Sequence, residues 1–277
     1  MGIEWSIVLI VIASYLIGSV NGSLVVSKFF LKTDIREYGS GNAGTTNTLR
    51  VMGKKWAAVV TLFDLLKGAL AVILGHYLTV GLDAATLGKL TAGVFCIVGH
   101  IFPLYFKFKG GKGVMTALAI VAFVDWRVAA ICLSLFVVVV LITRWVSLGS
   151  ILAVTGVPIC MYLFNRENER DILILTVLSA VITVILVIMH RENIKRILAG
   201  TERRFSLKGR AMLDTVKKKT AEALRNTARR IKKRQRRRKG RKAGKHKLRR
   251  QRKLSRRRAK RRARKSGGAQ KKTRAAL

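Results

Sequence analysis

Cysteine and acidic residues are the scarce components of this 277-residue chain. The three cysteines, Cys96, Cys132 and Cys160, all lie inside apolar runs. An odd number of cysteines in such surroundings argues against a disulfide framework, and their spacing fits no metal site. We therefore expect packing roles for them. Aspartate and glutamate number 13 against 54 lysines and arginines, which gives a formal net charge of +41.

A charge of this size conflicts with a soluble globular protein that is 50% hydrophobic. The conflict disappears once the charge is located along the chain. Residues 201–277 hold 36 of the basic residues and three of the acidic ones, a net charge of +33, whereas residues 1–200 carry only +8. The sequence thus predicts two parts: an apolar domain, residues 1–204, and a basic tail, residues 205–277.

The apolar domain contains runs long enough to cross a bilayer as helices, which takes about 20 residues each. We predict an all-α membrane protein with seven transmembrane helices. The first run lacks a basic start and a small-residue cleavage site, so we expect a retained span rather than a signal peptide. The predicted spans are 4–26, 56–80, 87–104, 113–125, 127–143, 147–164 and 171–189.

The distribution of lysine and arginine between the short loops predicts the orientation. The loops after the first, third and fifth spans, and the segment after the seventh, are basic, whereas the other loops are poor in charge, acidic or mixed. This pattern places the N-terminus outside and the C-terminus in the cytoplasm of a multi-pass protein of the plasma (inner) membrane. Three polar motifs at the ends of spans then share the cytoplasmic face.

The first motif, residues 39–50 (GSGNAGTTNTLR), combines glycines, hydroxyls, amides and an arginine. Glycine lets successive N–H groups point into one concavity that binds phosphate oxygens, and arginine grips phosphate with two parallel hydrogen bonds. The alternative is a flexible loop of turn residues. The candidate ligands are Gly39, Ser40, Gly41, Asn42, Thr46, Asn47 and Arg50.

The second motif, residues 107–113 (KFKGGKG), resembles a phosphate-binding loop in composition but lacks its Lys-Ser/Thr pair. A helix predicted from Val114 would add its N-terminus to an anion site. The alternative is three lysines that only enforce topology. His100, just before this motif, is expected to have a structural role. The candidate ligands are Lys107, Gly110, Gly111, Lys112 and Gly113.

The third motif, residues 190–196 (HRENIKR), places His190 and Asn193 on one face of a helix that leaves the membrane. His190 is a candidate general base, and the alternative is an interfacial histidine with snorkelling arginines. Asp64 and Lys67, one turn apart inside the second span, form either a structural ion pair or part of the site. Ser147, at the start of the sixth span, is a helix cap or a substrate contact.

These three motifs, in this order and beside membrane spans, resemble those of the bacterial acyl-phosphate-dependent glycerol-3-phosphate acyltransferases, the PlsY family. The resemblance includes Gly99, His100 and Pro103 before the second motif and residues 199–202 (AGTE) after the third, and it covers about residues 1–204. It implies seven transmembrane helices and an active site at the cytoplasmic face. It also implies transfer of a fatty acyl group from acyl-phosphate to the 1-position of glycerol 3-phosphate, with no cofactor, coenzyme A or metal.

The products implied are lysophosphatidic acid and phosphate, in the first step of phospholipid synthesis. An acyl phosphate has a good leaving group, so catalysis needs positioning of two phosphates more than acid catalysis. The family also implies a partner enzyme that makes the acyl donor. Thr45 departs from the family pattern, where a small alanine is expected. By the resemblance, the catalytic residues are Ser40, Arg50, His190 and Asn193, and the phosphate ligands include Thr46, Asn47, Gly110, Lys112 and Gly113, with Ser147 nearby.

The histidine spacing, two competing hypotheses and the basic tail also bear on function. None of the four histidines has an aspartate five residues later, which argues against the other large acyltransferase class. Two hypotheses compete with the enzyme. The protein could be a carrier for an anionic phosphorylated solute, or a membrane anchor for a nucleic-acid-binding tail. The tail, with a possible basic helix over 214–231, is suited to anionic lipid or to nucleic acid, or is a solvated extension without a catalytic role.

Overall fold

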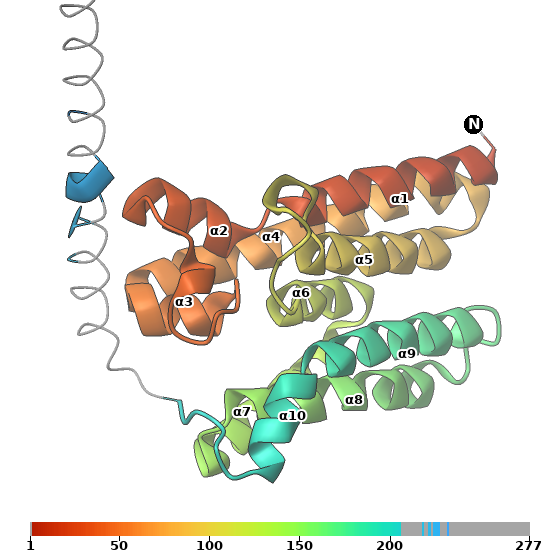
Figure 1. Ribbon diagram of the computed structural model, residues 1–277. Helices are drawn as coiled ribbons and strands as arrows, with labels where there is room; N and C mark the ends of the chain where they lie inside the picture. The colour runs from red at the N-terminus through yellow and green to blue at the C-terminus, as the bar shows by residue number, and fades with distance from the viewer. Residues whose placement is uncertain (1, 206–217, 219–220, 223, 228–231, 233–277) are drawn as a thin grey trace, which may run out of the picture. The chain divides into compact units, whose positions relative to one another are not determined.

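The computed structural model describes residues 2–205, 218, 221–222, 224–227 and 232, and these residues contain helices and no strands (Figure 1). The chain divides into two compact units, Met1–Thr220 and Ala221–Leu277. Most of the predicted helix over 214–231 lies outside the described residues, and the boundary at 204/205 stays a prediction. The α-helices of the first unit are α1 (Ile3–Ser19), α2 (Gly22–Val26), α3 (Thr45–Met52), α4 (Lys54–Thr79), α5 (Ala85–Ile101), α6 (Val114–Val124), α7 (Trp126–Thr143), α8 (Val146–Asn165), α9 (Ile172–Met189) and α10 (Arg191–Leu198).

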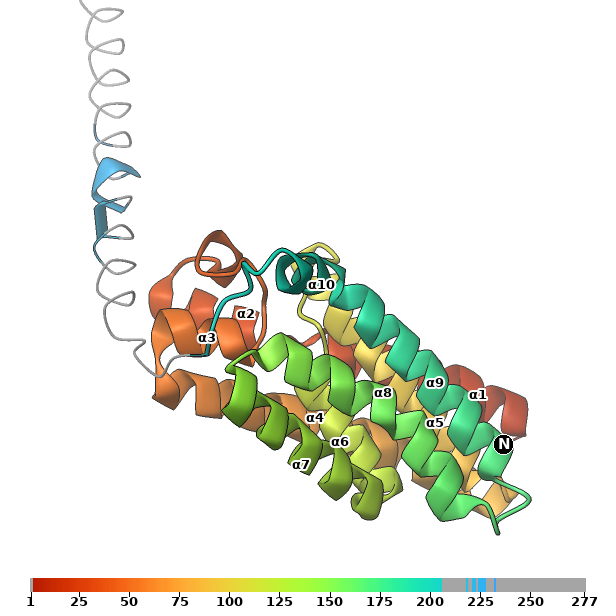
Figure 2. The ribbon, with the colours of Figure 1, turned by 90° about the horizontal axis from the view of Figure 1, so that it is seen from below.

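The long helices of the first unit form two packed groups joined by α6 (Figures 1 and 2). In one group α1 packs on α4 and α5, and in the other α8 packs on both α7 and α9. Helix α6 packs on α4 in the first group and on α7 in the second, while α5 contacts α9 directly. The short helices α2, α3 and α10 lie at one end of this bundle.

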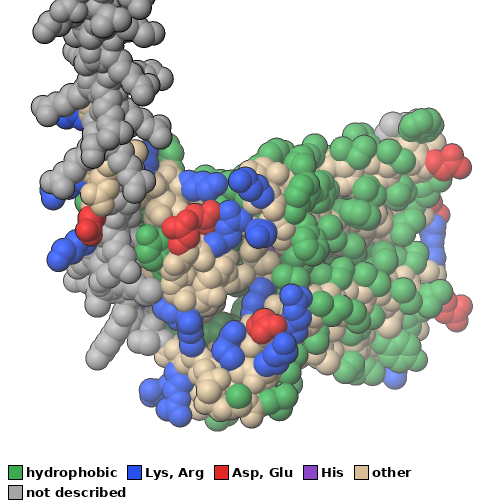
Figure 3. Space-filling model, viewed as in Figure 1, with side chains coloured by type: hydrophobic (Ala, Val, Ile, Leu, Met, Phe, Trp, Pro, Cys, Tyr) green, Lys and Arg blue, Asp and Glu red, His purple; other side chains and the backbone are tan. Residues whose placement is uncertain are grey.

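Within the described residues, six helical segments are long and apolar enough to cross a membrane. They agree with six of the seven predicted spans. The seventh, α6, has 11 residues, which is about 16 Å of helix and shorter than the hydrocarbon core of a bilayer. Figure 3 shows apolar side chains covering the face along α1, α5 and α9, as expected for a surface in contact with lipid. The six segments are Ile3–Leu31, Lys54–Leu82, Ala85–Phe106, Trp126–Thr143, Val146–Asn165 and Ile172–Met189.

Helix α6 is short because the second motif descends into the bundle before the helix begins. The N–H of Gly110 donates to the carbonyl of Ile101 at 2.9 Å, and that of Gly111 donates to the carbonyl of His100 at 3.2 Å. A Cβ placed on Gly113 would lie 3.3 Å from Ile97, one turn before the end of α5. The motif therefore occupies depth that a full-length span would otherwise fill.

The first span, predicted over 4–26, is present but is interrupted by a break in its helix. Helix α1 ends at Ser19, Val20 and Asn21 are extended, and the Asn21 side chain then caps α2 by accepting the N–H of Leu24 at 3.1 Å. At the break, the carbonyl of Val20 accepts a hydrogen bond from Lys67 Nζ at 3.2 Å instead of from a helical N–H. The break lies near the end of the helix, whereas a carrier of the broken-helix type has its break at the bilayer midplane.

Glycines allow the long helices to approach closely. A Cβ on Gly18 of α1 would collide with the backbone of Cys96 in α5, and one on Gly99 would collide with the backbone of Tyr15 and Ser19. Small residues at helix contacts are the usual means of tight packing in membranes, where the lipid is as apolar as the side chains. This contact fixes the end of α5, and so His100, against the α1–α2 break.

Candidate functional site

A cavity of about 570 Å³ opens at the end of the bundle that carries α2, α3 and α10. Figure 3 shows lysine and arginine side chains gathered at this end around a hollow. All three sequence motifs line the cavity, together with side chains from α4, α5 and α8. Its charged lining residues are Arg50, Asp64, Lys112, Arg191, Glu192, Arg196, Glu202 and Arg203.

The first motif folds into a loop around the amide of Asn47. Its Oδ1 accepts the backbone N–H of Ser40 at 2.8 Å, and its Nδ2 donates to the carbonyls of Tyr38 and Ile35 at 3.0 and 3.3 Å. Gly39 has a φ of +62°, and a Cβ there would collide with the Asn47 amide. Asn47 therefore shapes the loop that presents Ser40 to the cavity.

The end of this motif is helix α3, which begins after Gly44 without a side-chain cap. The N–H groups of Thr45 and Thr46 have no hydrogen-bond partner among the described residues, and both residues line the cavity. A helix N-terminus with open N–H groups favours an anion. Arg50, one turn further along α3, adds a guanidinium to the same wall.

The second motif is held to the first loop by Arg36. Its guanidinium donates to the carbonyls of Phe106 and Lys109 at 3.1 and 2.5 Å, and an ion pair of 2.6 Å with Asp34 fixes its orientation. At the end of the motif, Lys112 donates to Oδ1 of Asn193. Burial lowers the pKa of Lys112 to about 8, while the negative charge of Glu202 acts in the opposite direction.

His190 caps the end of α9 and is buried against the cavity wall. Its Nδ1 lies 2.8 Å from the carbonyl of Leu186, so Nδ1 carries the hydrogen and Nε2 keeps its lone pair. Burial and the nearby charge of Lys112 lower the pKa of His190 to about 4. The ring is therefore neutral near pH 7 and offers a hydrogen-bond acceptor.

Glu202 organises the third motif. Its Oε1 accepts from Ser147 Oγ at 2.8 Å and from Asn193 Nδ2 at 2.7 Å, and its Oε2 pairs with Arg196 at 2.8 Å. Burial acts to raise the pKa of Glu202, but these three donors outweigh it, so the pKa lies below its usual value. The carboxylate thereby links α8 to α10 beside the cavity.

Four of the predicted site residues do not line the cavity: Gly39, Lys107, Gly110 and Gly111. The side chain of Lys107 is exposed. A Cβ on Gly110 would collide with the carbonyl of His100, and one on Gly111 with the carbonyl of Ala43, so these glycines allow the motifs to pack together. The predicted residues that do line it are Ser40, Gly41, Asn42, Thr46, Asn47, Arg50, Lys112, Gly113, Ser147, His190 and Asn193.

Sequence reasoning did not include several lining residues among the site residues. Arg196 ends the third motif and Glu202 follows it, and their contacts show that both belong to the cavity. Asp64 had been left open between an ion pair and the site, and it is both, because it pairs with Lys67 and lines the cavity. His100, expected to be structural, lines the cavity as well.

Comparison with known proteins agrees with this geometry. Residues 8–200 match the family described as "Glycerol-3-phosphate acyltransferase". A glycerol-3-phosphate acyltransferase of Thermoanaerobacter pseudethanolicus is 41% identical over 201 residues, which are 73% of this chain and 96% of the relative. The glycerol-3-phosphate acyltransferase 2 of Bacillus anthracis is 42% identical over 195 residues, 70% of this chain and 97% of the relative.

Two solved structures are also similar. Both are crystal structures of PlsY, an integral membrane glycerol 3-phosphate acyltransferase, one in its glycerol 3-phosphate form and one in its lysophosphatidic acid form. Their TM-scores are 0.62 and 0.60, and each is 34% identical and covers 73% of this chain and 96% of the solved chain. The family match ends at residue 200, before the basic tail.

Proposed function

Because the chain belongs to the glycerol-3-phosphate acyltransferase family, we propose that it transfers a fatty acyl group from acyl-phosphate to the 1-position of glycerol 3-phosphate. The products would be lysophosphatidic acid and inorganic phosphate. The observation that carries the proposal is that all three motifs line one cavity at one end of a membrane-length bundle. The crystal forms of PlsY with glycerol 3-phosphate and lysophosphatidic acid support the acceptor and the product.

The polar part of the cavity suits two phosphate groups. Lys112 and Arg50 supply positive charge, and the first turns of α3 and α6 supply open N–H groups. Arg50 presents a planar fork that matches two phosphate oxygens. Much of the task is therefore to hold two anions close together, which would otherwise repel each other.

An apolar cavity of about 120 Å³ adjoins the polar one and supports a fatty acyl donor. Its walls come from α6, α7, α8 and α9, and it shares Val114, Met115, Phe136 and Ser150 with the polar cavity. An acyl chain lying there would place its phosphate at the N-terminus of α6. The same junction would bring the acyl carbonyl carbon to the polar side, where the acceptor binds.

The reaction then needs few proton transfers. The 1-hydroxyl oxygen of glycerol 3-phosphate forms a bond to the acyl carbonyl carbon, and the bond from that carbon to the phosphate oxygen breaks. A phosphate with a second pKa near 6 is a stronger base than His190 with its pKa of about 4. We therefore assign the proton to the departing phosphate, while Nε2 of His190 accepts a hydrogen bond that orients the hydroxyl.

We further propose seven membrane spans, with α6 as the short one, the N-terminus outside and the cavity facing the cytoplasm. The concentration of lysine and arginine at the cavity end supports this orientation. The basic tail, residues 205–277, would bind anionic headgroups of the same membrane face, and nucleic acid is the alternative ligand. A partner enzyme that makes acyl-phosphate would deliver the donor at that face.

Acyl transfer by the purified protein tests the proposal. Glycerol 3-phosphate would serve as the acceptor, and acyl-phosphate, acyl-CoA and acyl-carrier protein would be supplied separately. Lysophosphatidic acid should form from acyl-phosphate alone. Product from acyl-CoA alone would overturn the assignment of the donor, and no product from any donor in a folded sample would favour a carrier.

A further inference from the structure

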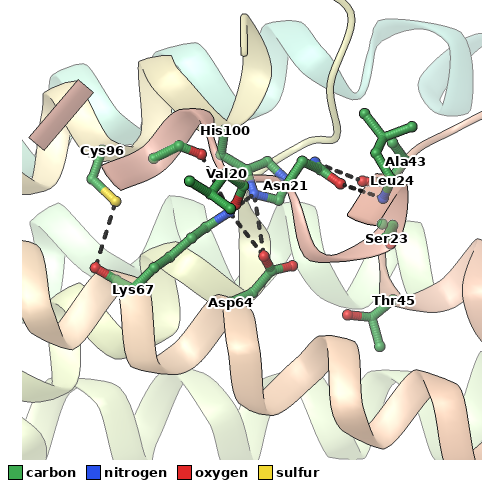
Figure 4. Close-up of polar contacts among 12 residues, drawn as sticks. Val20, Asn21, Ser23, Leu24, Ala43, Thr45, Asp64, Lys67, Cys96 and His100 are labelled. Atoms are coloured by element: carbon green, nitrogen blue, oxygen red, sulfur yellow. Dashed lines mark hydrogen bonds and ion pairs between the residues drawn. The ribbon is translucent and has the colours of Figure 1, made fainter. Parts of the chain in front are cut away.

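A buried polar cluster lies beneath the phosphate cavity and is not explained by the steps above (Figure 4). Asp64 and Lys67 of α4 and His100 of α5 are each no more than 5% exposed. Lys67 Nζ lies 2.9 Å from Asp64 Oδ1 and 2.7 Å from His100 Nδ1. Three ionisable groups buried together in a membrane protein are costly unless the arrangement is complete and useful.

Lys67 fixes which nitrogen of His100 carries the hydrogen. The ammonium only donates, so His100 Nδ1 accepts at 2.7 Å. Asp64 Oδ1 lies 3.6 Å from the same Nδ1, beyond hydrogen-bond range, so the carboxylate does not take a hydrogen from it. A neutral imidazole with an accepting Nδ1 carries its hydrogen on Nε2.

The Nε2 of His100 lies against the second motif. His100 lines the cavity, and a Cβ added to Gly111 would meet its Nε2, which places this atom beside the second motif. Among the described residues, nothing hydrogen-bonds to Nε2. The nearby carbonyl of Ala43 accepts from Asn21 at 3.2 Å, and no hydrogen bond joins it to Nε2 (Figure 4). The Nε2–H is therefore free to donate to a ligand that supplies an acceptor oxygen.

We propose that His100 is an anion-binding residue whose Nε2–H donates to a phosphoryl oxygen of the acyl-phosphate donor. This inference rests on the proposed function. Lys67 and Asp64 are positioning residues that hold the ring in the donating tautomer. We assign the donor phosphate rather than glycerol 3-phosphate to His100. Val114 and Met115, which directly follow the second motif, line both the polar cavity and the apolar one. A phosphate joined to an acyl chain in the apolar cavity would therefore lie beside the motif that Nε2 contacts.

Two variants of His100 distinguish the acceptor role of Nδ1 from the donor role of Nε2. In His100→Asn the amide oxygen takes the place of Nδ1 and no donor reaches the position of Nε2, whereas in His100→Gln the amide NH₂ replaces Nε2. His100→Asn should raise the KM for acyl-phosphate about 10-fold or more, the loss expected for a hydrogen bond to a charged group. The KM for glycerol 3-phosphate should change less than about threefold, and His100→Gln should keep most of the affinity for acyl-phosphate.

The inhibition constant for inorganic phosphate, competing with acyl-phosphate, should rise in parallel in His100→Asn. Equal changes in both KM values, or equal losses in the Asn and Gln variants at unchanged thermal stability, would overturn the proposal. If the wild type makes no product from acyl-phosphate, the proposed function fails instead, and direct binding of inorganic phosphate still tests His100.

A measurement on the wild type covers the case in which the His100→Asn variant does not fold. The protein has four histidines, so ¹⁵N-histidine NMR in detergent can resolve the His100 ring. The spectrum should show a protonated Nε2 and an unprotonated Nδ1, with Nε2 shifting on addition of inorganic phosphate. A hydrogen on Nδ1, or an Nε2 that phosphate leaves unmoved, would refute the assignment.

Discussion

The pKa of Lys112 predicts how activity depends on pH. Burial lowers it to about 8, so the ammonium is about nine-tenths protonated at pH 7 and about one-tenth protonated at pH 9. A pKa lowered in the free protein means that the charged form is lost as the pH rises through 8. Because only the ammonium attracts phosphate, kcat/KM should fall roughly tenfold between pH 7 and pH 9.

The assay is acyl transfer from acyl-phosphate at subsaturating substrate, since kcat/KM reports the ionisation of the free enzyme. Both substrates lose their second phosphate proton near pH 6, well below this range. Lys112→Arg is the matched control, because a guanidinium keeps its charge above pH 12. Whatever its absolute activity, the pH profile of Lys112→Arg should stay flat between pH 7 and pH 9.

Two results would refute this reasoning. A wild-type profile that stays flat up to pH 10 would mean that Lys112 keeps an ordinary pKa or that its charge is not needed. An alkaline loss of the same size in Lys112→Arg would assign the titration to another group. His190 is not that group, because its pKa of about 4 lies on the acid side.

Three further changes have defined outcomes. Arg50→Ala should lower kcat/KM about 100-fold, because two charge-assisted hydrogen bonds to phosphate are lost. Arg50→Lys should recover only part of this kcat/KM. A change under threefold in Arg50→Ala would show that Arg50 does not belong to the site. Glu202→Gln should lower the melting temperature in detergent and weaken glycerol 3-phosphate binding, because Arg196 loses its counter-charge; equal melting curves would contradict this. Deleting residues 206–277 should leave acyl transfer in detergent within about twofold and abolish binding to vesicles of anionic lipid, and a large loss of transfer would give the tail a catalytic role.

The long helices were predictable from the sequence because a bilayer imposes one length on every apolar run. The exceptions have local causes that a hydropathy pattern does not carry. The first span breaks at Val20, whose carbonyl accepts a hydrogen bond from a lysine 47 residues away in the sequence. Helix α6 is short because the glycines of the second motif let the chain pack under the end of α5.

The site was predictable to the level of its motifs, since glycine, hydroxyl and basic residues together indicate an anion site wherever they lie. Their individual tasks were not predictable, because glycine supplies both open N–H groups and close packing. Gly110 and Gly111 do the packing, whereas Gly113 lines the cavity. Glu202 escaped the prediction because an acidic residue argues against a phosphate site until its three donors are seen.

Negative charge inside an anion site has a physical purpose here. Lys112 is partly buried beside Arg196, and the positive charge of Arg196 helps to lower the pKa of Lys112. Glu202 offsets this repulsion and holds Ser147, Asn193 and Arg196 by hydrogen bonds, while Asp64 does the same for Lys67 beneath the cavity. Both carboxylates are already paired, so they cost an incoming phosphate little repulsion. The site can thus be ordered before the substrates bind, which is what a reaction governed by positioning requires.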